Sequence, residues 1–257
     1  NAGLPVPTAR RTETGDYYCS VEIRDDAKNE ERFVGVIEWV DGAPLGSVFA
    51  NTSQDVVPHY KQIGALAAKI RCHSTQWHPQ EGFTRRRWDI EGLLGDNPLW
   101  GRFWEAKTLT NKQKMLFNNA RKILRDQLSL LSTGPDRFGL IHSDLHLGNI
   151  MRNNDDLTII DFDDAGYGWF AHEAAVALHP SLGEPWFPSA REAFLDGYCS
   201  IHEMDSDEIN SINAFLVVRS LMIVGWLNAR PELPAYEYFP VVIEAAEKAV
   251  ENLVLDS

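Results

Sequence analysis

The sequence predicts an α+β protein in which a small, strand-rich N-terminal part precedes a larger, mostly helical part. Short runs of β-branched and aromatic residues near the N-terminus favour strands. From Pro58 onward, apolar residues recur every three or four positions, which favours helices. The chain has 257 residues and is 44% hydrophobic, which is enough to bury a sizeable core. We place the boundary after residue 41, so that the two predicted domains are 1–41 and 42–257.

Two strands are expected near the N-terminus, at Tyr17–Ile23 and Arg32–Glu38, with a turn at Asp25–Glu30 between them. The segment Glu38–Leu45 follows the second strand and contains a glycine and a proline, which break regular structure. The residues alone leave two interpretations of this segment open. It is either an ordinary exit from the strand or a hinge whose backbone groups contact a ligand.

The helical part begins with a helix from Pro58 to about His73. A capping box at Thr110–Gln113 opens a second helix, which a glycine and a proline end shortly after Leu131. Three more helices are expected towards the C-terminus: Pro188–Ser200, Ser206–Asn228 and Pro240–Val254.

The most informative stretch of the chain is Gly139–Asp164, which carries Asp144, Asn149 and Asp161 in a fixed order. Short apolar runs flank these residues and predict strands, and Asn153–Asp156 predicts a turn between two of them. A hairpin formed in this way would fold Asp161 back towards Asn149.

This arrangement suits the transfer of a phosphoryl group, which needs an oriented hydroxyl and neutralised phosphate charge. The carboxylate of Asp144 can accept the hydroxyl proton, while Asn149 and Asp161 offer the oxygen ligands that Mg²⁺ prefers. The spacing from His142 through Asp144 to Asn149 is that of a kinase catalytic loop. Asp161-Phe-Asp163 stands where protein kinases have Asp-Phe-Gly.

His142-Ser-Asp-Leu-His-Leu-Gly-Asn149 and Ile160-Asp-Phe-Asp-Asp164 resemble the motifs of the aminoglycoside phosphotransferase and choline kinase superfamily. The second histidine, the glycine before the asparagine and the aspartate in place of the third glycine distinguish them from ordinary protein kinases. Three further segments are similar to the branch that includes type II homoserine kinase-like and stress-response-kinase-like proteins: Arg87–Asp89, Leu99–Trp104 and Asp161–Trp169. The resemblance covers nearly the whole chain.

The resemblance implies a protein-kinase-like fold, ATP and Mg²⁺ as cofactors, and the hydroxyl group of a small molecule as acceptor. The catalytic residues it implies are Asp144, as base or hydroxyl-orienting group, and His142, which braces the loop. The implied nucleotide and metal residues are Glu38 and Val40 at the adenine through their backbone, Met151 and Ile160 beneath it, and Asn149 and Asp161 on Mg²⁺.

The chain departs from the superfamily in two places. Glu173 stands where an aspartate usually anchors the catalytic loop, so we expect an altered hydrogen bond there rather than lost chemistry. No glycine-rich phosphate loop and no strand lysine precede Tyr17, so part of the small lobe is expected to be missing. We therefore expect this chain alone to bind ATP weakly and to transfer phosphate slowly. An open strand edge would remain, and a homodimer through that edge is a further expectation.

Other interpretations stay open. The cluster from His142 to His146 could belong to a metal hydrolase, but the later histidines do not supply the further ligands that such a site needs. A protein Ser/Thr kinase of the stress-response type shares these motifs, and a catalytically inert kinase-fold fragment could act by binding alone. The acceptor is an amino alcohol, a homoserine-like compound, a sugar or an aminoglycoside. The role of Arg85, Arg86 and Arg87 is also open.

Composition limits the partners of the chain. The net charge is −13, which argues against nucleic acid and anionic membranes as main partners. The most apolar run, Ala214–Leu227, is too short to span a bilayer and carries Arg219, so a buried helix is expected. No signal peptide is recognisable, and the three cysteines show no metal or redox spacing. A cytoplasmic protein with reduced thiols is the resulting prediction.

Overall fold

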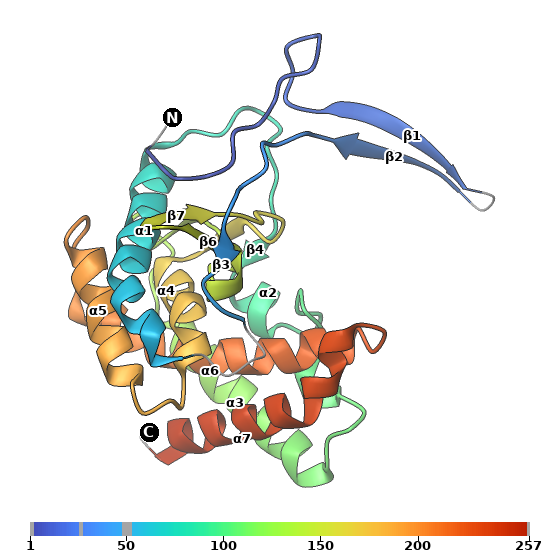
Figure 1. Ribbon diagram of the computed structural model, residues 1–257. Helices are drawn as coiled ribbons and strands as arrows, with labels where there is room; N and C mark the ends of the chain where they lie inside the picture. The colour runs from blue at the N-terminus through green and yellow to red at the C-terminus, as the bar shows by residue number, and fades with distance from the viewer. Residues whose placement is uncertain (1–2, 26–27, 48–52, 256–257) are drawn as a thin grey trace.

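The computed structural model describes residues 3–25, 28–47 and 53–255, and the fold is α+β, as predicted (Figure 1). The helices are α1 (Val57–Gln76), α2 (Ile90–Leu94), α3 (Asn111–Ser129), α4 (Phe170–Leu178), α5 (Phe187–Cys199), α6 (Ser206–Asn228) and α7 (Phe239–Leu255). The predicted helices correspond to α1, α3, α5, α6 and α7. The sequence pattern does not predict α2, which is a single short turn, or α4, whose residues are buried on every side.

The strands form three small sheets. Their members, in hydrogen-bonded order, are β1 (Cys19–Asp25) with β2 (Lys28–Val34); β3 (Ala43–Pro44), β6 (Ile150–Asn153) and β7 (Asp156–Ile159); and β4 (Arg87–Trp88), β8 (Gly166–Trp169) and β5 (Phe138–Ile141). The sheet of β4, β8 and β5 adjoins the predicted catalytic loop, because β5 ends immediately before that loop. Strand β8 of the same sheet continues directly into α4.

The hairpin of β1 and β2 projects away from the helical part (Figure 1). Its register pairs Cys19 with Val34 and Asp25 with Lys28, so the predicted start of the second strand at Arg32 is wrong. The strand residues of this hairpin whose exposure is assigned, such as Phe33, are exposed. Polar residues can therefore form strand pairs here, because the hairpin has no buried face that would require apolar side chains. Part of the predicted turn, residues 26–27, lies outside the described residues.

The predicted second strand also ends too late, because residues beyond Val34 pair elsewhere. Ile37 forms a bridge with Ala9, and the N–H of Glu38 donates to the carbonyl of Thr8 at 2.9 Å. Within the described residues, β1 and β2 pair only with each other, which leaves an open edge on each strand. A homodimer through such an edge stays a prediction.

Helix α6 is buried over much of its length because its sequence from Phe215 to Leu227 is mostly apolar. An unbroken run from Phe215 to Gly225 is buried, and the helix packs against α4 and α7. By length and composition α6 could cross a membrane, but 67% of its most apolar window is buried inside the molecule. The expected buried helix is therefore present, and it carries one arginine, Arg219, into the interior.

The hairpin of β6 and β7 has the predicted form. Asn153 pairs with Asp156, so the turn consists of the two residues between them, and Asn154 has a φ of 54°. Asparagine tolerates this left-handed conformation better than most residues. At the other end of the hairpin, the N–H of Ile160 donates to the carbonyl of Asn149 at 3.0 Å. The backbones on either side of the predicted metal site are thus joined.

Candidate active site

The predicted catalytic loop is residues 142–149, between β5 and β6, and α4 anchors it. The carboxylate of Glu173 accepts the N–H of His142 at 2.7 Å and the N–H of Ser143 at 2.8 Å. Ser143 has a φ of 66°, a strained conformation that these two bonds hold in place. Burial raises the pKa of Glu173 to about 7, although both hydrogen bonds oppose this shift. Glu173 therefore takes the anchoring position expected of it, with both oxygens engaged.

Asp144 lies in this loop with both carboxylate oxygens engaged by donors. Oδ1 accepts from Nη2 of Arg219 at 2.5 Å, and Oδ2 accepts from Nδ2 of Asn149 at 3.0 Å. Nε2 of His146 lies 3.3 Å from the same Oδ2. Burial alone would raise the pKa of Asp144, but the charge of Arg219 and the His146 contact outweigh it and hold the pKa well below its usual range. Asp144 is therefore an ionised acceptor in a fixed orientation.

The two histidines of the loop are held in single tautomers by backbone groups. Nδ1 of His142 accepts the N–H of Asp144 at 3.2 Å, which leaves Nε2 to donate to the carbonyl of Ile160 at 3.0 Å. Nδ1 of His146 accepts the N–H of Gly148 at 3.0 Å, so its Nε2–H faces Asp144. Neither ring keeps a free lone pair for a metal, which removes the basis of the hydrolase interpretation. His142 contacts the residue after β7, and its role in bracing the loop stays a prediction.

The predicted Mg²⁺ ligands lie on adjoining segments. Nδ2 of Asn149 donates to both the carbonyl and Oδ2 of Asp144, each at 3.0 Å, which leaves the amide oxygen available. Asp161 follows Ile160 directly, is exposed and has a φ of 63°. One carboxylate and one amide oxygen fit Mg²⁺, which retains waters and binds phosphates. Among the described residues, no three His, Cys, Asp or Glu side chains gather into a metal site. Convergence of Asn149 and Asp161 on one ion stays a prediction.

The residues predicted to contact adenine lie around the sheet of β3, β6 and β7. Pro44 pairs with Met151, which brings the segment after Val40 against β6. Met151 and Ile160 are half-buried. Met151 lies on β6, and Ile160 directly follows β7. The N–H of Glu38 already donates to the carbonyl of Thr8, so a nucleotide could bind only the carbonyl group of the Glu38 backbone. The contact of these residues with adenine stays a prediction.

Gly42 allows the segment after Val40 to lie on β6. Its φ is 129°, and a Cβ at this position would lie 2.4 Å from the carbonyl oxygen of Arg152. We expect Gly42→Ala to lift this segment and to raise the KM for ATP about tenfold, with a smaller effect on kcat. Steady-state kinetics with ATP and acceptor varied in turn would measure this. Gly15→Ala is the matched control, because Gly15 has a φ of 90° but no atom within 4 Å of a built Cβ. An unchanged KM for ATP in Gly42→Ala would contradict the expectation.

The arginine cluster braces the segment after Asp161. Nη1 of Arg86 pairs with Oδ1 of Asp164 at 2.5 Å, and Nε1 of Trp88 donates to the Asp164 carbonyl at 2.9 Å. Arg87 pairs with Asp89 at 3.0 Å, and Nη1 of Arg85 lies 3.4 Å from the carbonyl of Asp163. The contacts of Arg85, Arg86 and Trp88 thus join β4 and the residues before it to residues 163–164, whereas the Arg87 pair is local.

The contact of Arg219 with Asp144 is not predicted from the sequence, where Arg219 argues only against a membrane span. The available signal is a single arginine inside a long apolar helix. A buried charge requires a partner, and Asp144 is that partner. The sequence does not say which carboxylate this is, because Asp144 lies 75 residues earlier in the chain.

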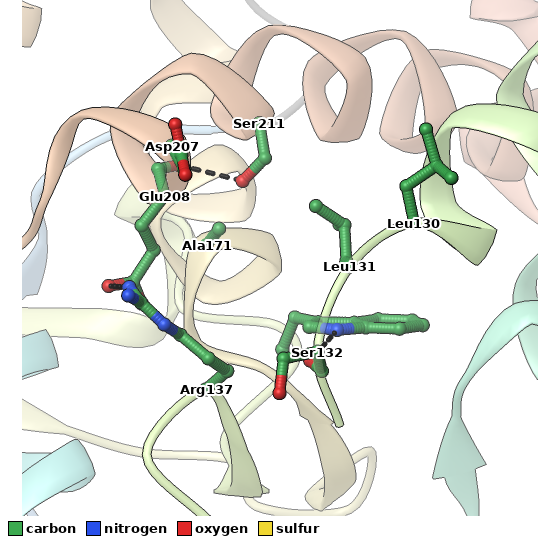
Figure 2. A pocket seen from close by; sticks show the side chains of 9 residues that line it. Leu130, Leu131, Ser132, Arg137, Ala171, Asp207, Glu208 and Ser211 are labelled. Atoms are coloured by element: carbon green, nitrogen blue, oxygen red, sulfur yellow. Dashed lines mark hydrogen bonds and ion pairs between the residues drawn. The ribbon is translucent and has the colours of Figure 1, made fainter. Parts of the chain in front are cut away.

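A cavity of about 230 Å³ lies at the opposite end of β5 from the catalytic loop (Figure 2). Figure 2 shows Arg137 and Glu208 side by side at this cavity, with Leu131 and Ser132 facing them. Arg137 pairs with Glu208 at 2.5 Å, and Glu208 also pairs with the buried Arg71 at 2.8 Å. This network ties α1, β5 and α6 together away from the catalytic loop.

A family model described as "Phosphotransferase enzyme family" matches residues 1–208. Among curated proteins, amicoumacin kinase of Bacillus subtilis (strain 168) is 30% identical over 155 residues, covering 57% of this chain and 43% of that protein. The match thus spans less than half the length of this relative.

Solved structures share the fold over nearly the whole chain. The structure of a microcompartment-associated aminopropanol kinase has a TM-score of 0.78 and 27% identity, covering 96% of this chain and 74% of its own. The structure of an amicoumacin kinase in complex with AMP-PNP and Ca²⁺ has a TM-score of 0.73 and 21% identity, and the match covers 96% of this chain and 73% of that one. The expected kinase-like architecture is confirmed.

Proposed function

Because the chain belongs to the phosphotransferase enzyme family, we propose that the protein transfers the γ-phosphate of ATP to a hydroxyl group of a small molecule. The observation that carries this proposal is the geometry of Asp144. An ionised carboxylate is fixed between an arginine, an asparagine amide and a histidine at the end of β5. The resemblance to the aminoglycoside phosphotransferase and choline kinase superfamily is confirmed, and its narrower branch stays a prediction.

In the proposed reaction, Asp144 accepts a hydrogen bond from the acceptor hydroxyl and turns its oxygen towards the phosphate. Positioning and charge stabilisation carry most of the catalysis in phosphoryl transfer, so a fixed acceptor group serves this step well. Asn149 and Asp161 would hold Mg²⁺, which offsets the negative charge of the phosphates when it is bound. Glu173 and His142 keep the loop in the shape that presents Asp144.

The relatives support an acceptor that is a small molecule, and they make an amino alcohol the first candidate. One solved relative is named as an aminopropanol kinase and a curated one as an amicoumacin kinase. Homoserine-like compounds, sugars and aminoglycosides are the other candidates, because acceptor specificity varies within one fold. We place the reaction in the cytoplasm, in keeping with three free cysteines in the structure.

An acceptor screen on the full-length gene product tests the proposal. ATP and Mg²⁺ would be supplied with each of the four acceptor classes, and separately with a protein rich in serine and threonine. ADP release and ³¹P NMR of the product would be followed. We expect one small-molecule class to give a kcat/KM at least about a hundredfold above the others. Phosphate incorporation into protein alone would favour the protein kinase alternative. ATP binding without transfer to any acceptor would favour a catalytically inert kinase-fold protein that acts by binding.

A further inference from the structure

Arg219 is a charged residue inside the apolar helix α6. Its side chain is 3% exposed and lies within the buried run from Phe215 to Gly225. Its Nη2 donates to Oδ1 of Asp144 at 2.5 Å. A guanidinium is costly to bury unless it is paired, so this contact joins the helix to the catalytic loop in one defined geometry.

A group of tryptophans holds the guanidinium in place. Cζ of Arg219 lies 4.5 Å from the ring centroid of Trp100. Trp100 packs edge-on against Trp88, with centroids 5.9 Å apart, and is tilted against Trp226 at 6.1 Å. An indole and a carboxylate therefore fix Arg219 together.

The backbone next to Trp100 is seated directly on α6. A Cβ on Gly225 would lie 2.6 Å from the carbonyl oxygen of Gly101, so only glycine permits this approach. The Trp100 segment and α6 consequently form one rigid support for Arg219.

The donors to Asp144 are divided unequally between its two oxygens. Oδ1 receives Arg219, whereas Oδ2 receives Asn149 and lies beside His146. Without Arg219, every remaining side-chain donor would act on Oδ2, and the carboxylate could turn about its Cβ–Cγ bond. Nη1 of Arg219 is buried and has no hydrogen-bond partner within the described residues. This arrangement costs stability, because a buried donor without a partner is unfavourable.

We propose that Arg219 is a positioning residue, which holds the Asp144 carboxylate in the orientation that the acceptor hydroxyl requires. This inference rests on the proposed function, since it takes Asp144 as the group that orients the hydroxyl. Arg219 acts through Asp144 and does not touch the nucleotide. Its loss should therefore lower kcat and leave the KM for ATP nearly unchanged.

Kinetics of Arg219→Met and Arg219→Lys test this role. Arg219→Met should lower kcat about a hundredfold, because a displacement of about 1 Å in the reacting groups has an effect of that size. Arg219→Lys should recover part of the loss, since an ammonium can still donate to Oδ1 but lacks the planar fork that stacks on Trp100. Arg121→Met is the matched control: Arg121 also stacks on a tryptophan, Trp104 at 4.0 Å, and pairs with an aspartate, Asp96. A kcat in Arg219→Met equal to that of the control would overturn the proposal.

A double-mutant cycle on thermal stability tests the same contact without any activity. Arg219→Met leaves the Asp144 charge without its strongest partner and should lower Tm markedly. Adding Asp144→Asn removes that charge, so the double variant should melt several degrees above Arg219→Met alone. Asp144→Asn should not rescue Arg121→Met. If the wild type phosphorylates no acceptor, the proposed function fails while this cycle still decides whether Arg219 holds Asp144. A double variant no more stable than Arg219→Met would overturn the inference whatever the activity.

Discussion

Replacing Asp144 by asparagine should lower kcat about a thousandfold while the Kd for ATP changes by less than about threefold. An amide cannot take the hydroxyl proton and is a weaker acceptor than a carboxylate, and contributions of this kind are of the order of a hundredfold to ten-thousandfold. Among the described residues, the side-chain contacts of Asp144 are with Arg219, Asn149 and His146. Asparagine keeps an oxygen that can accept from the Asn149 amide, so the predicted Mg²⁺ ligand keeps its partner. The loss should therefore fall on the chemical step.

Single-turnover kinetics and calorimetric ATP binding on the full-length gene product measure the two quantities separately. Asp126→Asn is a suitable control, because Asp126 is an exposed aspartate on α3, outside the catalytic loop. Retention of most of the turnover number in Asp144→Asn would remove Asp144 from its proposed role. A large rise in Kd would instead place it among the groups that hold the nucleotide.

Glu173→Gln should also have a large effect, because this one side chain accepts two backbone N–H groups at the start of the catalytic loop. Glutamine keeps one acceptor oxygen but turns an NH₂ group towards one of the two amides that Glu173 now accepts. A buried donor left without its acceptor costs about 1–3 kcal/mol. The strained backbone at Ser143 would then relax and move Asp144. We expect kcat to fall about a hundredfold. Glu192→Gln, at an exposed position on α5, should change neither activity nor stability.

The stability difference between wild type and Glu173→Gln should also depend on pH. Burial raises the pKa of Glu173 to about 7 from an ordinary value of 4.5, so the folded state binds a proton more tightly than the unfolded state. The contribution of Glu173 to the free energy of unfolding is then fully present below about pH 4.5. It decreases as the pH rises through about 7, by as much as about 3 kcal/mol. The advantage of the wild type should therefore shrink between pH 5 and pH 8. Urea unfolding of both proteins at the two pH values measures it, and an equal difference at both would contradict the prediction.

Features that depend on neighbouring residues could be predicted from the sequence. The hairpin of β6 and β7 follows from two apolar runs around Asn154, and helix α3 follows from a capping box that the structure contains at Thr110. The order of Asp144, Asn149 and Asp161 along these elements places them near one another before any tertiary contact is known. Local spacing is sufficient here because the catalytic loop and the hairpin are consecutive in the chain.

Features that depend on tertiary contacts could not be predicted in the same way. The bounds of β2 were misjudged because an exposed hairpin is not constrained by a buried face, so apolar residues do not mark its ends. The pairing of Arg219 with Asp144 joins residues 75 positions apart, and no local pattern encodes it. Glu173 was recognised as an anchor only through the resemblance, and its two bonds to the loop emerge only when α4 is packed against β5.

The position of Arg219 has a consequence for how this enzyme family diversifies. The family match ends at residue 208, near the start of α6, and the arginine that contacts Asp144 lies eleven positions further on in the same helix. If Arg219 positions Asp144 as we propose, substitutions in α6 or at Trp100 would change the orientation of the Asp144 carboxylate while Asp144, Asn149 and Asp161 themselves stay in place. Two descendants with identical signatures could then differ in the hydroxyl they phosphorylate. Inheritance of the signature and inheritance of acceptor choice are separable in this architecture.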